Sequence, residues 1–370
     1  MAEPALGFLR LARTESVGPV TYRRLLARFS SPEAALDALP ALARSGGRPN
    51  PPRIPPMAET AREYEALSRL GGKFLFLDQP GYPDYLAELP DAPPAIAVLG
   101  DEALLRTRSI GIVGARNASA NGMRLAAHLA AELAPHLTIV SGLARGIDKA
   151  AHEGALRGGR TIAVIAGGLD MPYPPENADL QRRIAETGAV LAEAPLGTAP
   201  IGRHFPKRNR IIAGLTLGLV VIEAAARSGS LLTARLAAEA GREIFAVPGS
   251  PLDPRAKGGN DLIRQGAHLT ETADDVLANL PAHLTPRRAP PPGFAESQPL
   301  WADAPASEDE LLRARREIPA LLSPEPVGVD EIARRCQLSI TVIRAAILEL
   351  ELAGRAESLA GDRVALPEDP

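Results

Sequence analysis

Residues 109–115, SIGIVGA, form an uncharged apolar run that ends in small residues. Such a run is typical of a strand buried on both faces of a sheet. Five more nearly continuous apolar runs follow it, at 137–143, 161–168, 189–194, 218–224 and 243–249. The segments between them, such as GMRLAAHLAAELA at 122–134, have apolar residues at helical spacing. This alternation predicts an α/β fold with a doubly wound, mostly parallel sheet.

Proline-rich stretches divide the chain of 370 residues into four parts. Residues 1–70 contain short helical patterns and predict a small helical domain. The α/β core follows at 71–280. Residues 281–307 contain seven prolines and little periodicity, so we expect a linker there. Residues 308–370 contain three helical patterns and then a short alternating segment, which together predict a winged helix.

Composition limits the kind of protein this chain can be. Hydrophobic residues make up 45% of it, which is ample for a packed core, and the net charge of −3 confines any polyanion site to a local patch. The lone Cys336 excludes an intramolecular disulfide framework and a cysteine-cluster zinc site, and we expect no metal site. No apolar run approaches the ~18 residues of a membrane span, and the N-terminus has no signal-peptide pattern. We therefore expect a soluble, cytoplasmic protein that makes no contact with a membrane.

The loops that follow the predicted strands are rich in glycine, serine and asparagine. In a parallel sheet these loops meet at one edge, beyond the carboxyl ends of the strands, where ligands usually bind. Five of the six carry arginine or lysine; the loops are 114–122, 141–152, 166–177, 194–210, 225–233 and 248–260. Glycine lets a ligand approach the backbone, and the N–H groups at helix starts favour anions. The sequence therefore predicts an anion site at this edge.

The usual nucleotide motifs are absent from these loops. There is no GxxxxGK[ST] sequence, which argues against P-loop hydrolysis of ATP or GTP. The first loop reads GIVGAR rather than GxGxxG, and no acidic residue ends the second strand. A dinucleotide-dependent oxidoreductase is therefore disfavoured, and we expect no cofactor.

A basic run, FPKRNRIIAG at 205–214, lies at a predicted helix start. Four fixed positive charges stand between Arg203 and Arg210, with no carboxylate among them. Lys207 and Arg210 are three residues apart and share a helix face, while Ile211 and the isoleucine after it turn toward the sheet. Cations in a first helical turn oppose the helix dipole, so we expect an anionic ligand to compensate them. The alternative is a solvated helix start whose cations pair with Glu193 or Glu223.

SGS, at 228–230, precedes another helical pattern and is a candidate phosphate-binding cup. Ser230 or Thr233 could instead be a plain N-cap, and the sequence leaves these two interpretations about equal. Ser228 has no convincing His or Asp partner, so a hydrolase triad is not indicated.

Three further polar residues are expected to be structural. Asp148 is expected to cap the helix that continues through His152. His152 is expected to be a helix residue near the core rather than a base. Glu223, at a strand end, is expected to orient Arg208 or Arg210.

Several of these motifs, in this order, closely resemble the DNA-processing protein A (DprA/Smf) family. They are GARNASANG, SGLARGID, TIAVIAGGLDMPYPPEN, FPKRNRIIAGL, EAAARSGSLLTA and FAVPGSPLDPRAKGGNDLIRQGA. The resemblance runs from about residue 75 to residue 280. The segment ESVGPVTYRRLLARFSSPEAAL, at 15–36, resembles the sterile-alpha-motif-like or helix-hairpin-helix domain of part of that family, and the tail resembles its winged helix.

The resemblance implies an extended Rossmann-like core that binds single-stranded DNA without an essential catalytic step. Members of the family dimerise, protect incoming strands in natural transformation and help to load RecA recombinase. The strand-binding positions that it implies here are Arg116, Lys207, Arg208, Asn209, Arg210, Ser228, Gly229 and Ser230. Arg145, in SGLARGID, is a further candidate for DNA binding. Asn121 stands where many relatives have a tyrosine, which puts an aromatic contact at that position in doubt.

The predicted winged helix is acidic. Residues 308–370 hold eight arginines and thirteen carboxylates, and the expected recognition helix, TVIRAAILELELAG, offers one arginine and two glutamates. Base and phosphate contacts need cations or amides, so this domain is expected to make protein contacts or to be regulatory rather than to bind DNA.

Two other functions compete with strand binding. Related Rossmann-like nucleotide phosphoribohydrolases carry PGGxGTxxE, and aligning on the threonine places Leu236 where that motif needs its catalytic glutamate. Without a carboxylate the acid–base help for glycosidic cleavage is missing, so we expect no enzyme. A transcription factor acting through the winged helix is disfavoured by the acidic tail.

Overall fold

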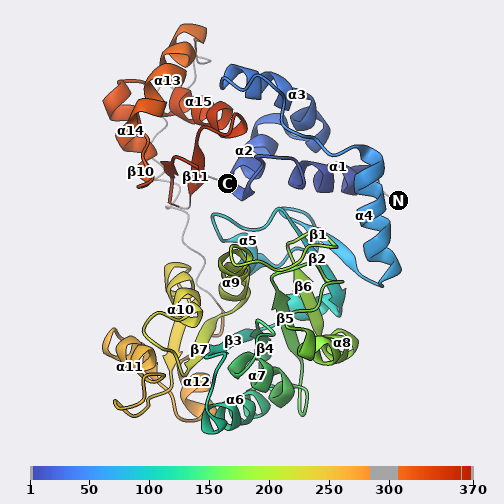
Figure 1. The fold of residues 1–370 in the computed structure, drawn as a ribbon, viewed down its shortest axis with the longest axis vertical. Coiled ribbons are helices and arrows are strands. Elements are labelled where there is room, and N and C mark those ends of the chain that lie inside the picture. Colours follow the sequence, from blue (N-terminus) through green and yellow to red (C-terminus); the bar gives the residue numbers. More distant parts are fainter. Residues whose placement is uncertain (1–2, 284–306, 360, 368–370) are drawn as a thin grey trace. The chain divides into compact units, whose positions relative to one another are not determined.

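The computed structural model describes residues 3–283, 307–359 and 361–367 (Figure 1). Contacts divide them into two compact units: Arg62–Leu284, and the residues up to Ala61 together with the C-terminal tail. Most of the predicted linker, 281–307, lies outside the described residues. Within the described ranges, no helix is both long and apolar enough to cross a membrane.

The larger unit is built on one sheet, to which the described residues contribute nine strands in the order β1-β2-β6-β5-β4-β3-β7-β8-β9. The strands are β1 (Lys73–Phe76), β2 (Ala95–Gly100), β3 (Ser109–Gly114), β4 (Thr138–Ser141), β5 (Thr161–Ile165), β6 (Ala189–Ala192), β7 (Gly218–Ile222), β8 (Glu243–Ala246) and β9 (His268–Leu269). Neighbours from β6 to β9 pair in parallel, whereas β2 pairs antiparallel with β1 and β6. The predicted doubly wound, mostly parallel sheet is confirmed, and each of the six predicted runs contains a strand.

Helices cover both faces of the sheet because its central strands are apolar on both sides. All the residues of β4, β5, β6 and β7 are buried. On one face, α6 (Ala120–Leu133), α7 (Ile147–Ala155) and α12 (Ala273–Asn279) pack on a cluster that contains Ile110, Ile112 and Val220. On the other face lies α9 (His204–Leu215), whose Ile212 approaches Gly111 of β3. The helix α4 (Met57–Arg69) crosses the boundary between the two units. The remaining helices of the larger unit are α5 (Asp84–Ala87), α8 (Ala178–Thr187), α10 (Gly229–Glu239) and α11 (Lys257–Arg264), with 3-10 turns η1 (Glu102–Arg106) and η2 (Pro175–Asn177).

The direction of winding reverses between β3 and β7. From β3 the chain adds β4, β5 and β6 on one side, and it then returns to place β7 and β8 on the other side. The loops after β3 and β7 therefore diverge at the carboxyl edge of the sheet. A crevice at such a switch point is where ligands bind in open parallel sheets.

The smaller unit contains the N-terminal helices and the tail. Its N-terminal helices are α1 (Glu3–Ala12), α2 (Pro19–Phe29) and α3 (Pro32–Ser45). The tail folds as α13 (Glu308–Leu321), α14 (Val329–Cys336) and α15 (Ile340–Leu352), with a small sheet in the order β10-β12-β11. Its strands are β10 (Val327–Gly328), β11 (Glu357–Leu359) and β12 (Arg363–Ala365). The predicted helical domain and winged helix are thus both confirmed.

Candidate functional site

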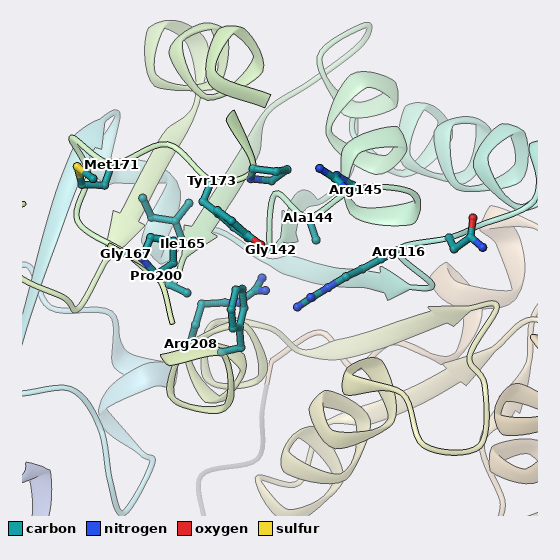
Figure 2. A pocket seen from close by; sticks show the side chains of 14 residues that line it. Arg116, Gly142, Ala144, Arg145, Ile165, Gly167, Met171, Tyr173, Pro200 and Arg208 are labelled. Carbon is teal, nitrogen blue, oxygen red and sulfur yellow. The ribbon is translucent and has the colours of Figure 1, made fainter. Parts of the chain in front are cut away.

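Three adjoining hollows follow the carboxyl edge of the sheet. The largest, about 710 Å³, lies at the switch point, between the loop after β3 and the start of α10. The second, about 340 Å³, is lined by the residues after β4 and β5 (Figure 2). The third, about 220 Å³, is lined by those after β5 and β6. We call the three together the edge groove.

Arg208 is the one described residue that lines all three hollows. It belongs to α9, and its side chain is only 6% exposed. The guanidinium lies against the loop after β4, where a Cβ on Gly142 would stand 1.2 Å from Nη1. Glycine is therefore required at position 142, because any side chain there would expel the guanidinium.

The buried guanidinium of Arg208 is only partly satisfied. Its Nη1 lies 3.9 Å from Oδ2 of Asp148 and donates a long hydrogen bond of 3.5 Å to the Val164 carbonyl. Its Nε has no hydrogen-bond partner among the described residues. Burial lowers the pKa of Arg208, whereas the charge of Asp148 raises it. Burial likewise raises the pKa of Asp148, against the charge of Arg208. A cation held in this way favours an anionic ligand in the groove, because its charge is only partly compensated within the protein.

Arg116 faces Arg208 across the second hollow, and the two guanidinium groups point toward one another (Figure 2). Arg116 is an exposed residue of the loop after β3. Its guanidinium carbon lies 4.8 Å from the centre of the Phe205 ring. The Phe205 ring is tilted against that of Tyr173, with 5.9 Å between ring centres. The groove therefore combines cations with two aromatic rings.

The basic run does not act as one patch, because successive residues of α9 face different neighbours. Lys207 is exposed and lines the third hollow. Asn209 is buried and donates from Nδ2 to the Gly229 carbonyl of α10 at 3.4 Å. Ile211 and Ile212 pack into the core, as predicted.

Arg210 does not itself line the groove, although its partner Glu193 lines the third hollow. Its Nη2 donates to both carboxylate oxygens of Glu193, at 2.7 and 2.8 Å, and its Nε is 3.7 Å from Asp91. Its side chain is 9% exposed and lines none of the three hollows. Lys207 and Arg210 lie three residues apart on α9 and so share one side of the helix, as expected, but only Lys207 is exposed. For Arg210 the alternative interpretation is confirmed, because this cation of the basic run pairs with Glu193.

The SGS segment opens α10 at the wall of the largest hollow. Ser228 occupies the N-cap position, but its side chain makes no capping hydrogen bond. Instead, its Oγ lies 2.8 Å from the hydroxyl of Ser230, and the Thr233 hydroxyl donates to the Gly229 carbonyl at 3.2 Å. The interpretation of Ser230 or Thr233 as plain N-caps is therefore wrong, and Ser228, Gly229 and Ser230 all line the groove.

Arg145 lines the second hollow, from the loop after β4. Its Nε donates to a carboxylate oxygen of Glu176 in an exposed ion pair. This hydrogen bond raises the pKa of Arg145 and lowers that of Glu176. Part of the Arg145 charge is thus already compensated within the protein.

Of the three polar residues expected to be structural, only His152 lies as predicted. It is fully buried, and burial lowers its pKa to about 3. Asp148 lies in the first turn of α7, and its Oδ2 accepts from the Ala144 backbone at 3.4 Å rather than capping the helix. Glu223 orients neither Arg208 nor Arg210. Its carboxylate accepts from the Ser119 backbone at 2.8 Å and from the Ser119 hydroxyl, which fixes the loop that carries Arg116.

Sequence reasoning missed three residues of the groove. They are Phe205, which stands within the basic run, and Tyr173 and Arg255, which stand in two other loops of the same edge. Aromatic residues make up 4% of the chain, so two of them in loops at the carboxyl edge were a usable signal. Arg255, which lines the largest hollow, pairs with Asp253 at 2.8 Å.

Fold and groove together define a class of three-part Rossmann-like proteins with a cationic groove at the sheet edge. Comparison with known protein families shows which family within this class the chain resembles. Residues 73–281 match the model of DNA recombination-mediator protein A. Residues 2–66 match the DprA-like N-terminal HHH domain, and residues 302–362 match the DprA winged helix domain. The chain belongs to the DprA/Smf family.

Several known proteins are similar in sequence or structure to this chain, and one of them matches it over nearly its whole length. Protein Smf of Synechocystis sp. is 34% identical, over 96% of this chain and 97% of its own length. DNA processing protein DprA of Streptococcus pneumoniae is 48% identical over 53% of this chain and 70% of its own. The X-ray structure of the S. pneumoniae protein superposes with a TM-score of 0.66 at 35% identity, covering 76% of this chain and 99% of that one. DNA processing protein A from Helicobacter pylori, solved for its single-stranded DNA binding mode, gives a TM-score of 0.51 at 31% identity, over 56% of this chain and 95% of that one.

Proposed function

We propose that this chain is a recombination mediator that binds single-stranded DNA along the edge groove. The observation that carries the proposal is Arg208, a buried and only partly paired cation that lines three adjoining hollows. A guanidinium in this position suits phosphate, which offers several acceptor oxygens to one donor group.

The other groove residues extend this phosphate path. Arg116 and Arg145 line the second hollow, Lys207 the third, and Ser228–Ser230 the largest. A ligand that reaches all of them must carry several negative charges along its length. Because the net charge of the protein is −3, the attraction is local to this edge. Arg210 stabilises the position of α9 beside the groove through its ion pair with Glu193.

The aromatic rings favour a single strand over a duplex. Phe205 and Tyr173 line the second hollow beside the cations. Bases of a single strand can stack on such rings, whereas bases in a duplex are already stacked on one another. The H. pylori relative, described for its single-stranded DNA binding mode, supports the same ligand class.

The proposed activity is binding and delivery rather than catalysis. Leu236, half-buried on α10, stands where the phosphoribohydrolase motif has glutamate, and a leucine side chain cannot transfer a proton. Membership of a recombination-mediator family supports a role in loading RecA onto strands taken up in natural transformation, in the cytoplasm and as a homodimer.

Binding of a labelled oligo-dT and of a duplex of equal length, over about 50 to 200 mM salt, tests the ligand class. The wild-type chain should prefer the single strand. Arg116→Glu should bind it more weakly and flatten the log–log salt slope by at least ~0.7, the share of one phosphate contact. Arg235→Glu is the matched control, since Arg235 is an exposed cation outside the groove. Equal binding of duplex and single strand, or an unchanged Arg116→Glu variant, would refute the proposal.

Separate measurements test the proposed homodimer, the delivery of RecA and the proposal that the chain is not an enzyme. Light scattering should give twice the chain mass, and the protein should speed assembly of RecA on strands coated with single-strand-binding protein. Release of free base from nucleoside monophosphates would show that the chain is an enzyme after all.

A further inference from the structure

Helix α15 of the winged helix has two buried faces. Ile343, Ile347 and Leu350 belong to the core of the winged helix itself. Leu348 and Leu352 lie on the opposite side of the helix and outside that core, yet they are 3% and 0% exposed. A helix that is apolar all round needs a second partner. That partner is the N-terminal part of the chain, because α15 packs against α3 as well as against α13 and α14.

Polar contacts surround this second face. Glu351, near the end of α15, is 5% exposed. Its carboxylate accepts from the Thr21 hydroxyl at 3.3 Å and from the Ser358 backbone at 2.7 Å, and it pairs with Arg24 at 3.5 Å. Arg48 donates to the Leu352 carbonyl at 3.4 Å. A buried carboxylate would be costly without such partners, so the N-terminal helices and α15 are matched to one another.

Gly46, just after α3, shows how closely the two parts approach. A Cβ there would stand 2.0 Å from the backbone oxygen of Glu349 and 2.9 Å from the Cβ of Ala353. The backbone of Gly46 has φ −71° and ψ −5°, which any residue adopts without strain. Only the contact with α15 therefore demands glycine at this position.

The charges of the two parts are complementary. Residues 1–61 carry eight arginines and five carboxylates, whereas residues 308–370 carry eight arginines and thirteen carboxylates. We propose that the winged helix is a docking module whose partner is the N-terminal helical domain of the same chain, and that the second half of α15 serves this docking instead of reading DNA. In the docked state Arg24 pairs with the carboxylates of Glu351 and Asp362, so its charge is not available to bind a phosphate group.

Thiol labelling of the full chain tests the docking, with the thiol introduced by Leu352→Cys as the reporter. The native Cys336, buried in the core of the winged helix, reports whether that domain stays folded. In the otherwise unchanged chain both thiols should react slowly with a maleimide. Adding Gly46→Ala should speed labelling of the introduced thiol at least tenfold and leave Cys336 slow.

Gly18→Ala is the matched control, because Gly18 is in the same domain and its Cβ would meet nothing within 4 Å. It should leave both labelling rates unchanged. Rapid labelling of the introduced thiol without Gly46→Ala, or slow labelling with it, would overturn the proposal. Loss of protection on dilution would also overturn it, since the cover would then come from a second copy.

Discussion

Lys207 and Arg210 are three residues apart in one basic run, and the structure predicts opposite consequences for their removal. Lys207 is exposed and lines the edge groove, whereas Arg210 is buried against Glu193. Lys207→Ala should therefore weaken strand binding without affecting folding. Arg210→Ala should destabilise the fold without removing a strand contact.

The magnitudes follow from the contacts. Loss of one phosphate contact by Lys207→Ala lowers the single-strand salt slope by ~0.7, which is roughly five-fold in affinity at 0.1 M salt. The unfolding free energy of that variant should change by less than about 0.5 kcal/mol, as for other surface substitutions. Arg210→Ala breaks a two-oxygen ion pair whose arginine side chain is 9% exposed. Breaking a buried pair costs ~3–5 kcal/mol, and the low end applies because the Glu193 side chain is 24% exposed.

Urea unfolding and oligo-dT binding over a salt series, both measured on each variant, separate the two effects. Arg210→Ala must be assayed for binding below its own unfolding midpoint, so that only folded protein is compared. The reasoning is refuted if Arg210→Ala loses ~0.7 of the salt slope while its unfolding free energy is unchanged. It is also refuted if Lys207→Ala unfolds as readily as Arg210→Ala.

Two further outcomes follow from the groove and from the core beneath it. Phe205→Ala should weaken oligo-dT binding by ~1–3 kcal/mol at an unchanged salt slope, since a stacked base rather than a phosphate contact is lost. Phe205→Trp should retain binding. If Phe205→Ala bound oligo-dT as tightly as the wild type, the stacking role would be contradicted. His152 has its pKa lowered to about 3, so the folded protein keeps it neutral while the unfolded chain takes up a proton below about 6.5. Between these values the wild type should lose up to ~1.4 kcal/mol of unfolding free energy per pH unit as the pH falls, relative to His152→Gln, and a pH-independent difference in urea unfolding would contradict this.

Local patterns were enough to predict the sheet and the edge at which the groove lies. The strand at 109–115 and its neighbours are buried on both faces, so their apolar runs are nearly unbroken and easily recognised. Parallel strands bring their following loops to one edge, so the sequence alone indicates that the loops of Arg116, Lys207 and Arg208 meet there, whereas the role of Arg116 itself is implied by the family resemblance. The strand at 95–100 was not singled out.

The partners of individual side chains could not be predicted in the same way. Arg210 meets Glu193, which is 17 residues away, and Glu223 meets Ser119, which is 104 residues away. Such pairings depend on how helices sit on the sheet, and periodicity carries no information about that. The sequence offered Glu193 and Glu223 as equal partners for the basic run, and only the first of them pairs with it. The burial of Arg208 likewise depends on space left by Gly142, in a different loop.

The turn of about 100° per residue in α9 has a consequence for how this segment can vary in length. Four successive side chains of α9 point in different directions and contact different neighbours; they belong to Lys207, Arg208, Asn209 and Arg210. Their order along the chain therefore decides which neighbour each of them contacts. One residue inserted between Lys207 and Ile211 would rotate the following side chains and turn the guanidinium of Arg210 away from its carboxylate. Residues 195–202, which precede the helix, set none of these directions. Insertions and deletions should therefore be rejected within the first half of α9, whereas in the loop before it they would leave these directions unchanged and alter only the part of the groove wall that Pro195, Thr198 and Pro200 form.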